Sequence, residues 1–128
     1  MRVKAVLFDL DGTLADTAVI TTRALTAAFQ RAGLSGHPPL AEFHALSGHA
    51  LEDIFARLGL PTELTHYFRA AATEMVTQSQ LFPGARELLT ELRGQGIRVG
   101  VITGKERIRA VTTLRHLEID GVVEELVA

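Results

Sequence analysis

The chain contains 128 residues, of which 47% are hydrophobic, with 13 lysines and arginines against 15 aspartates and glutamates. This length is sufficient for one compact domain with a hydrophobic core. The formal net charge of -2 argues against a nucleic-acid-binding protein, because affinity for phosphate backbones comes from clustered Lys and Arg. The absence of cysteine excludes disulfides, thiolate metal sites and cysteine nucleophiles.

The first residues do not have the pattern expected of a signal peptide. Arg2 and Lys4 precede a short apolar run, but Asp9 interrupts this run well short of a signal-peptide core. No apolar stretch approaches the roughly 20 residues that are needed to span a bilayer. The sequence therefore predicts a soluble, cytoplasmic protein without a membrane partner.

Strand and helix patterns alternate along the chain. Residues 3–10 are rich in Val, Leu and Phe and end at Asp-Gly, which predicts a buried strand. Helical periodicity then follows without an intervening strand, and two of the clearer segments are followed directly by a glycine, Gly33 or Gly59. These predicted helices cover residues 25–32, 51–58 and 64–75, with a shorter segment at 40–46.

A second run of alternating elements begins after Pro83 and Gly84. It predicts a helix over 85–92, a strand over 97–103, a helix over 105–117 and the start of a third strand over 121–127. This order predicts an α/β protein whose parallel sheet is connected by right-handed crossovers and is interrupted by an all-helical insert. In such sheets, ligands bind at the carboxyl ends of the strands.

Two acidic residues follow the first predicted strand. Asp9 and Asp11 are two positions apart, so an extended backbone places both side chains on one face. Two carboxylates at ~4 Å repel each other by about 1 kcal/mol in water and by about 4 kcal/mol at an intermediate dielectric. Such a pair favours a shared proton or a hard cation, most naturally Mg²⁺. The alternative is a simple Asp-Gly turn with solvated carboxylates.

The string Asp9-Leu10-Asp11-Gly12-Thr13 resembles the opening motif of the haloacid dehalogenase-like (HAD) hydrolase superfamily. Chance would produce its four fixed positions on the order of once in a thousand chains of this length. Phe82-Pro83-Gly84 and Val101-Ile102-Thr103-Gly104-Lys105 resemble the segment that leads into the second motif of the family. The helical insert resembles the cap of the phosphoglycolate phosphatase and β-phosphoglucomutase branch.

The resemblance implies a Rossmann-like parallel sheet core over residues 1–15 and 82–128, and a helical cap over 16–81. It makes Asp9 the nucleophile that receives the phosphoryl group, and Asp11 the general acid and base. Asp9 and Asp11 together would hold Mg²⁺, and the Thr103 hydroxyl would donate to a phosphoryl oxygen. An ordinary solvated strand-end threonine is the alternative for Thr103. Further substrate-binding positions are Gly12, Thr13, Gly104 and, from the cap, His49.

The later motifs of the family are not found in this sequence. The third motif is a lysine and the fourth an acidic pair, yet no lysine follows Lys105, and the acids beyond it lack the family's context. The resemblance therefore implies a truncated core. Compared with the family, it would lack ~60 to 90 residues, at ~30 residues per strand-helix unit. Lys105 is a candidate substitute for the missing lysine, because it lies at the N-terminus of a predicted helix, where an anion is favoured. The alternative is a surface lysine.

The truncation also predicts an exposed strand. Residues 3–10 would lack one neighbour and form an apolar sheet edge, and such edges promote strand pairing. We therefore expect self-association through this edge.

The insert offers less information about the substrate. His44 and His49 resemble positions of the cap specificity loop, although each is also typical of a surface histidine. The relatives with mutase activity carry an arginine shortly after Gly48, and the sequence has none there, which favours a phosphatase over a sugar-phosphate mutase.

The sequence leaves two hypotheses about function. The first is a phosphatase that uses Mg²⁺ to hydrolyse a small phosphorylated metabolite, and the second is a non-catalytic HAD-like module that binds phosphate or a protein.

Overall fold

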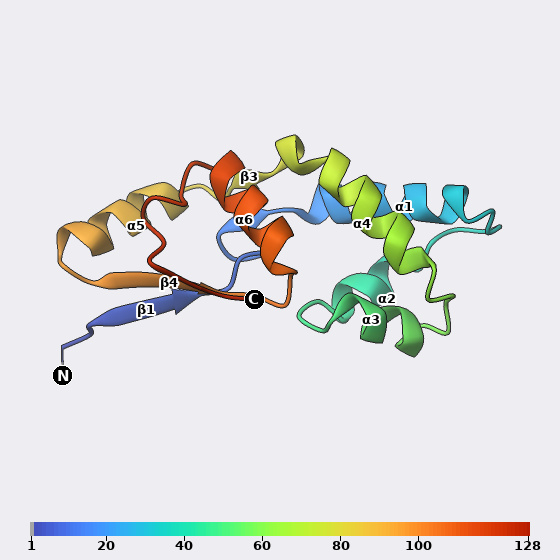
Figure 1. Ribbon diagram of the computed structural model, residues 1–128, viewed down its shortest axis with the longest axis horizontal. Helices are drawn as coiled ribbons and strands as arrows, with labels where there is room; N and C mark the ends of the chain where they lie inside the picture. Colours follow the sequence, from blue (N-terminus) through green and yellow to red (C-terminus); the bar gives the residue numbers. More distant parts are fainter. Residues whose placement is uncertain (1) are drawn as a thin grey trace. The chain divides into compact units, whose positions relative to one another are not determined.

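The computed structural model describes residues 2–128, which divide into two compact units. One unit comprises the described residues up to Ala18 together with Gln78–Ala128, and the other comprises Val19–Thr77. The first unit contains β1 (Ala5–Phe8), β2 (Ala15–Asp16), β3 (Gln80–Leu81), α5 (Ala85–Gly94), β4 (Arg98–Ile102), α6 (Arg107–His116) and β5 (Glu125–Val127) (Figure 1). The helices of the other unit are α1 (Ala18–Arg31), α2 (Leu40–Ala45), α3 (Leu51–Arg57) and α4 (Leu64–Glu74), followed by the short 3-10 helix η1 (Val76–Gln78).

Strands β1, β4 and β5 form a parallel sheet in the order β1-β4-β5. The register places Leu7 opposite Gly100, and Val101 opposite Leu126. Parallel neighbours require crossover connections, and α5 and α6 provide them. The predicted α/β fold with a parallel sheet and a helical insert is therefore confirmed.

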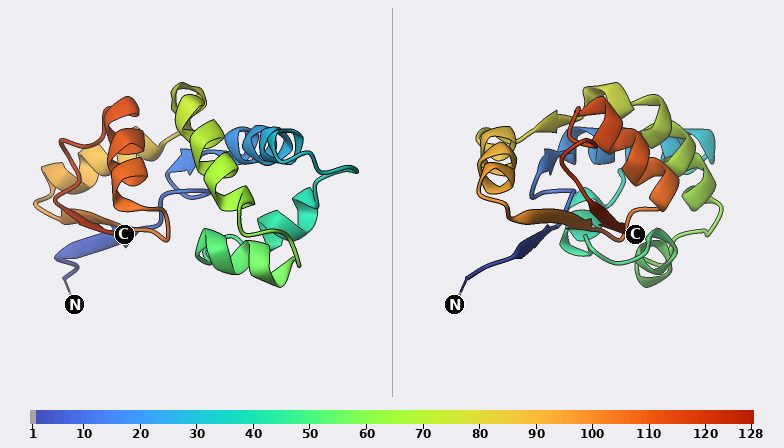
Figure 2. Two further views of the ribbon diagram at one scale, coloured as in Figure 1. Left: turned by 45° about the vertical axis from the view of Figure 1, so that its right-hand side comes forward. Right: turned by 60° about the vertical axis from the view of Figure 1, so that its left-hand side comes forward.

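The core of this unit lies between the sheet and its two helices. Helices α5 and α6 lie on the same side of the sheet (Figures 1 and 2). Val99 and Val101 of β4 are almost fully buried, as are Leu89 of α5 and Leu114 of α6. These aliphatic side chains bury apolar surface at about 25 cal/mol per Å², which is the main force that holds the helices on the sheet.

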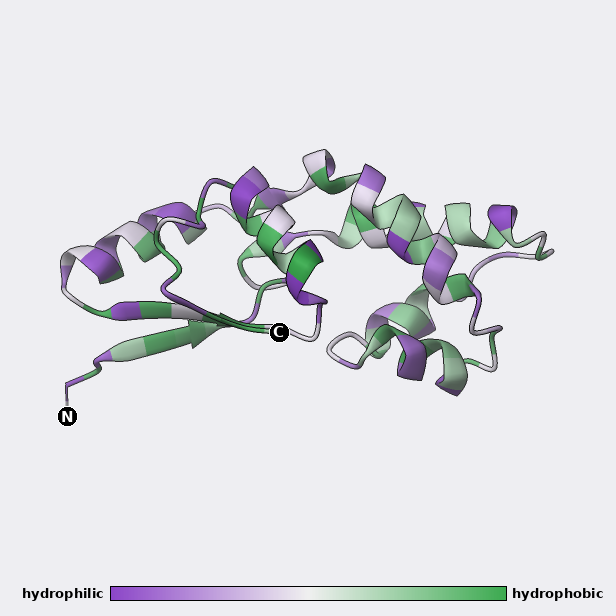
Figure 3. Cartoon of the chain, in the orientation of Figure 1, coloured by the Kyte–Doolittle hydropathy of each residue, from purple (hydrophilic) through white to green (hydrophobic). Residues whose placement is uncertain are grey.

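The opposite face of the sheet is exposed. Leu7 is 59% exposed, and the paired residues Ile102 and Val127 are 48% and 46% exposed. Leu7 lies over Gly100, since a Cβ atom built on that glycine would stand 2.5 Å from Leu7 Cδ2. Leu7, Ile102 and Val127 therefore lie on the exposed face of the sheet. Strand β1, which carries Leu7, is apolar along its length (Figure 3).

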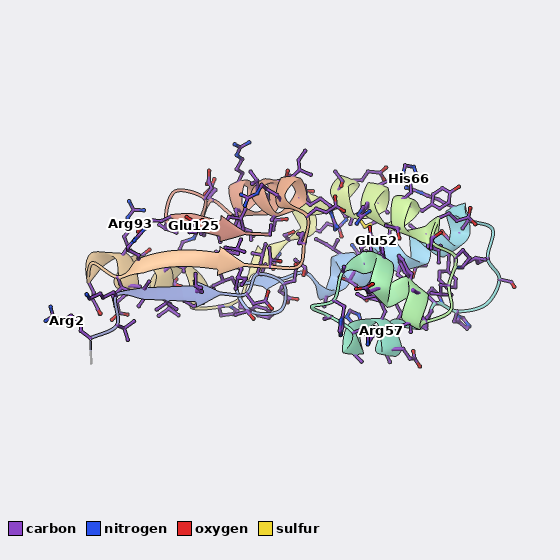
Figure 4. All side chains as sticks on the ribbon, turned by 60° about the horizontal axis from the view of Figure 1, so that its bottom comes forward. Arg2, Glu52, Arg57, His66, Arg93 and Glu125 are labelled. Carbon is purple, nitrogen blue, oxygen red and sulfur yellow. The ribbon has the colours of Figure 1, made fainter. Side chains whose placement is uncertain are left out.

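Strand β1 lies at the edge of this sheet within residues 2–128. The sequence predicted a strand over residues 3–10, and the observed strand is shorter. Leu10 turns away from the strand, because its carbonyl oxygen accepts three backbone hydrogen bonds from the loop that follows. Arg2 lies just before β1 (Figure 4), which places a charge at the start of the edge.

The sequence did not predict the small antiparallel pair of β2 and β3. Ala15 pairs with Leu81 and Asp16 with Gln80, while Phe82 N donates to Leu14 O at 3.0 Å. A strand of two residues has no detectable alternation, so the pairing depends entirely on the tertiary structure. It joins the two segments of chain that flank the helical insert.

The helical unit has its own core, built on three aromatic rings. Phe43, Phe55 and Phe68 have ring centroids 5.4–6.2 Å apart in tilted or edge-on arrangements, and all three side chains are buried. Small residues of α1, Ala24 and Ala28, are fully buried beside them. The predicted helices are thus confirmed as elements, although α1 begins at Ala18 rather than near residue 25.

An ion pair joins two helices at the surface of the same unit. Arg69 Nη2 donates to Glu52 Oε1 at 2.6 Å. A backbone hydrogen bond at the start of α3, and secondly this bond from Arg69, hold the pKa of Glu52 below its ordinary value. The pair therefore stabilises the fold at neutral pH and loses this effect as the pH falls through the lowered pKa. Because Glu52 is 55% exposed, the effect is at most about 1 kcal/mol.

Across residues 2–128, the helices are all too short or too polar to cross a bilayer.

Candidate functional site

A tight loop follows β1 and fixes the backbone of the acidic motif. Leu10 O accepts hydrogen bonds from the backbone N–H groups of Leu14 at 3.1 Å and Ala15 at 2.9 Å. Gly12 has a φ of +79° and donates its own N–H to Ala15 O at 2.9 Å. A positive φ at this point explains why glycine follows the second aspartate, since other residues are strained there.

Asp9 is the first residue after β1, and its side chain is exposed. Its Oδ1 accepts a hydrogen bond from Leu10 N at 2.8 Å. This contact fixes one carboxylate oxygen against the backbone. An exposed, oriented carboxylate at the end of a strand is accessible to a ligand from solvent.

Asp11 makes the most specific polar contacts of the motif. Its Oδ1 accepts a hydrogen bond from Thr17 Oγ1 at 2.7 Å and another from Lys105 Nζ at 2.9 Å. Lys105 is 94 positions away in the sequence, and its side chain is only 13% exposed, against 38% for Asp11. The fold therefore brings the segments after β1 and β4 into direct contact through this ion pair.

The loop after β4 orients Thr103 and Lys105. Thr103 N donates to Val127 O at 2.8 Å, which continues the ladder between β4 and β5 by one bond. Thr103 Oγ1 accepts a hydrogen bond from Lys105 N at 3.1 Å. Because the hydroxyl oxygen acts as an acceptor in this bond, its proton can be donated to another group.

The structure brings three of the predicted site residues into contact: Asp11, Thr103 and Lys105. Asp11 contacts Lys105, whose backbone N–H reaches Thr103. Asp9, Gly12 and Thr13 belong to the loop after β1, and Gly104 to the loop after β4. His49 belongs to the other unit, Val19–Thr77, and its side chain is exposed there.

Thr17 is a site residue that the sequence analysis did not identify. It is 6% exposed, and its hydroxyl donates to the same oxygen of Asp11 as Lys105 does. The nearest helix predicted from the sequence covers residues 25–32, so the position of Thr17 gave no sign of a link to Asp11. A buried hydroxyl requires a partner, and the carboxylate of Asp11 provides one.

The chemistry of the donor set fits Mg²⁺. Among residues 2–128, no group of three or more His, Cys, Asp or Glu side chains is arranged to hold a metal. Mg²⁺ does not need such a group, because it retains several waters and typically binds one or two carboxylates together with the phosphate of a substrate. The exposed Asp9 carboxylate and the adjacent Asp11 provide hard oxygen donors of this kind.

These features define a class of α/β protein with acidic and hydroxyl groups at the carboxyl ends of neighbouring parallel strands. Comparison with known proteins identifies the family. The family model described as haloacid dehalogenase-like hydrolase matches residues 6–128. A 5'-nucleotidase of Pseudomonas aeruginosa is 31% identical over 126 residues, which are 94% of this chain and 57% of the nucleotidase.

Two further relatives agree with this match. A phosphoglycolate phosphatase of Nitrosospira multiformis is 29% identical over 131 residues, with 93% of this chain and 57% of the phosphatase covered. The solved structure of a haloacid dehalogenase-like hydrolase from Streptococcus pneumoniae superimposes with a TM-score of 0.81 at 27% identity, covering 97% of this chain and 60% of that one.

The chain therefore belongs to the haloacid dehalogenase-like hydrolase family, in its phosphoglycolate phosphatase and β-phosphoglucomutase-like branch. It spans a little over half the length of the first two relatives.

Proposed function

We propose that this protein acts as a phosphatase that hydrolyses a small-molecule phosphate monoester through an aspartyl-phosphate intermediate. The observation that carries the proposal is the contact between two strand-end loops. Asp11 after β1 forms an ion pair with Lys105 after β4. Family membership and relatives that are named as phosphatases support the same chemistry.

The proposed reaction begins with the exposed Asp9 carboxylate. One of its oxygens attacks the phosphorus atom, the bond from phosphorus to the ester oxygen breaks, and the phosphoryl group is transferred to Asp9. Asp11 donates a proton to the departing alkoxide oxygen, so that the product leaves as an alcohol. Asp11, now ionised, then accepts a proton from the water that attacks the phosphorus of the intermediate. The bond from phosphorus to the Asp9 oxygen breaks, inorganic phosphate leaves and the Asp9 carboxylate is restored.

The loops around Asp9 supply hydrogen-bond donors to the phosphoryl oxygens. The Thr103 hydroxyl can donate because its oxygen already accepts from Lys105 N. The backbone N–H of Gly104 lies in the loop after β4, next to Thr103, and we assign it to the phosphate as well. Such preoriented donors stabilise the charge that develops on the phosphoryl oxygens in the transition state.

We assign Mg²⁺ to the Asp9 carboxylate and to Asp11, through its backbone carbonyl oxygen. Bound there, the ion would neutralise the negative charge of the carboxylates and of the incoming phosphate.

The first test of this function is hydrolysis of p-nitrophenyl phosphate by the purified chain with and without Mg²⁺. We expect phosphate release that is lost when EDTA removes the metal and returns when Mg²⁺ is added in excess. Circular dichroism in both conditions checks that the fold is retained. A folded chain that releases no phosphate in the presence of Mg²⁺ contradicts the proposal and favours a binding module.

The second candidate function is phosphate or protein binding without catalysis, and the edge position of β1 favours it. The outer edge of β1 has no strand partner within the described part of the chain, and Leu7 of this strand is 59% exposed. Unpaired apolar edges promote pairing between chains. We propose that the chain self-associates through this edge.

This proposal predicts a concentration-dependent increase in mass. Sedimentation of the native chain is expected to show dimers or larger species, and Leu7→Lys to shift the population towards monomer, because a charge on an edge disfavours strand pairing. Ile108→Lys is the matched control, since Ile108 is also exposed, at 75%, but lies on α6. A native chain that remains monomeric at every concentration would count against the proposal.

A further inference from the structure

The two donors that hold Asp11 contact the same oxygen. Thr17 Oγ1 and Lys105 Nζ lie 2.7 and 2.9 Å from Asp11 Oδ1. Both groups lie among the more buried polar side chains of the unit, since Thr17 is 6% exposed and Lys105 is 13% exposed. A pair of fixed donors on one oxygen prevents free rotation of the carboxyl group.

The arrangement makes the two oxygens of Asp11 chemically different. When a carboxyl group is protonated, one oxygen carries the proton and donates, while the other remains an acceptor. An oxygen that already accepts from an ammonium and from a hydroxyl is a poor site for a proton. Both contacts are made to Oδ1, so Oδ2 is the oxygen that these two donors leave for exchange with a substrate.

We propose that Lys105 is a positioning residue that acts through Asp11, by holding Oδ1 so that Oδ2 exchanges the proton with the leaving group. This inference rests on the proposed function, in which Asp11 is the general acid. It differs from the sequence-based expectation that Lys105 substitutes for a lysine that neutralises the phosphate. The geometry supports the positioning role, because the ammonium group of Lys105 is in direct contact with the carboxylate of Asp11.

The two roles predict different dependence on the leaving group. A p-nitrophenolate leaves without a proton, whereas the alkoxide of an alkyl phosphate such as glycerol 1-phosphate requires a general acid. If Lys105 acts through Asp11, Lys105→Met will reduce kcat/KM for the alkyl phosphate by about 10-fold more than for p-nitrophenyl phosphate, with little change in KM. If Lys105 binds phosphate instead, Lys105→Met will reduce kcat/KM equally for both substrates and will raise KM.

The experiment measures kcat and KM on both substrates for the native chain and its variants. Asp11→Asn is the reference and is expected to show the same selective loss. Lys105→Arg is expected to recover part of the alkyl phosphate activity, because it retains a cationic donor. Lys4→Met is the matched control, since Lys4 is the other lysine of the chain and is exposed. Lys105→Gln is measured in parallel, so that a folded variant is available if Lys105→Met does not fold.

The outcomes separate the inference from the proposed function. A native chain that hydrolyses neither substrate overturns the proposed function, and the inference with it. A native chain that is active, combined with equal losses on both substrates or no loss on either, overturns the inference alone. A selective loss on the alkyl phosphate that Lys105→Arg partly restores supports the inference.

Discussion

Replacement of Asp9 by Asn is expected to reduce kcat for phosphate release by about 10,000-fold or more. The substitution keeps the size of the side chain but removes the charged oxygen that attacks phosphorus in the proposed reaction. Asp9 is exposed and one of its oxygens accepts only a local hydrogen bond from Leu10 N, so the fold is expected to be unaffected. The measurement is phosphate release at saturating substrate, with circular dichroism as the check on folding.

A matched control separates the role of Asp9 from a general effect of charge. Asp120→Asn makes the same chemical change at an exposed position in the segment between α6 and β5. It is expected to retain the native rate. If Asp9→Asn retained more than about one tenth of the native kcat, attack by Asp9 would be excluded as the chemical step.

Replacement of Phe55 by Ala is expected to lower the free energy of unfolding by about 3–5 kcal/mol. Phe55 is fully buried, and its ring contacts those of Phe43 and Phe68 in the core of the helical unit. The loss combines the burial of the ring with the cavity that remains. Since small domains are stable by only about 5–15 kcal/mol, this change is a large fraction of the total.

Urea denaturation followed by circular dichroism measures this effect. Val19→Ala in the same unit is the control, because Val19 is 52% exposed and its truncation is expected to change stability by about 0.5 kcal/mol or less. Equal stability of Phe55→Ala and the native chain would show that the three rings do not form the core of this unit.

Hydrophobic periodicity was sufficient to predict the α-helices and the strands of the parallel sheet, but not the short pair of β2 and β3. The apolar runs at residues 3–10 and 97–103 predicted two strands, and the structure has strands within both. Their parallel pairing was expected from the alternation of strands and helices, since parallel neighbours are joined by crossover connections, usually helical ones. The ends of the elements depended on local hydrogen bonds, such as those to Leu10 O, which periodicity does not detect.

The composition of the site was easier to predict than its contacts. The spacing of Asp9, Asp11 and Gly12 carries chemistry that can be read directly from the sequence, because a paired carboxylate and a positive-φ turn need these residue types. The link between Asp11 and Lys105 spans 94 positions and depends on the packing of two strand ends. Thr17 was missed for the same reason, since only the folded chain places its hydroxyl on Asp11.

The proposed reaction requires that Asp9 becomes phosphorylated during turnover. Its most direct test is an acid quench of the chain during turnover of p-nitrophenyl phosphate with Mg²⁺, followed by mass spectrometry of the peptide that contains Asp9. We expect a phosphoryl group on this peptide in the native chain and none in Asp9→Asn. Phosphate release at the native rate without a phosphoryl group on Asp9, or with one on another residue, would exclude Asp9 as the nucleophile.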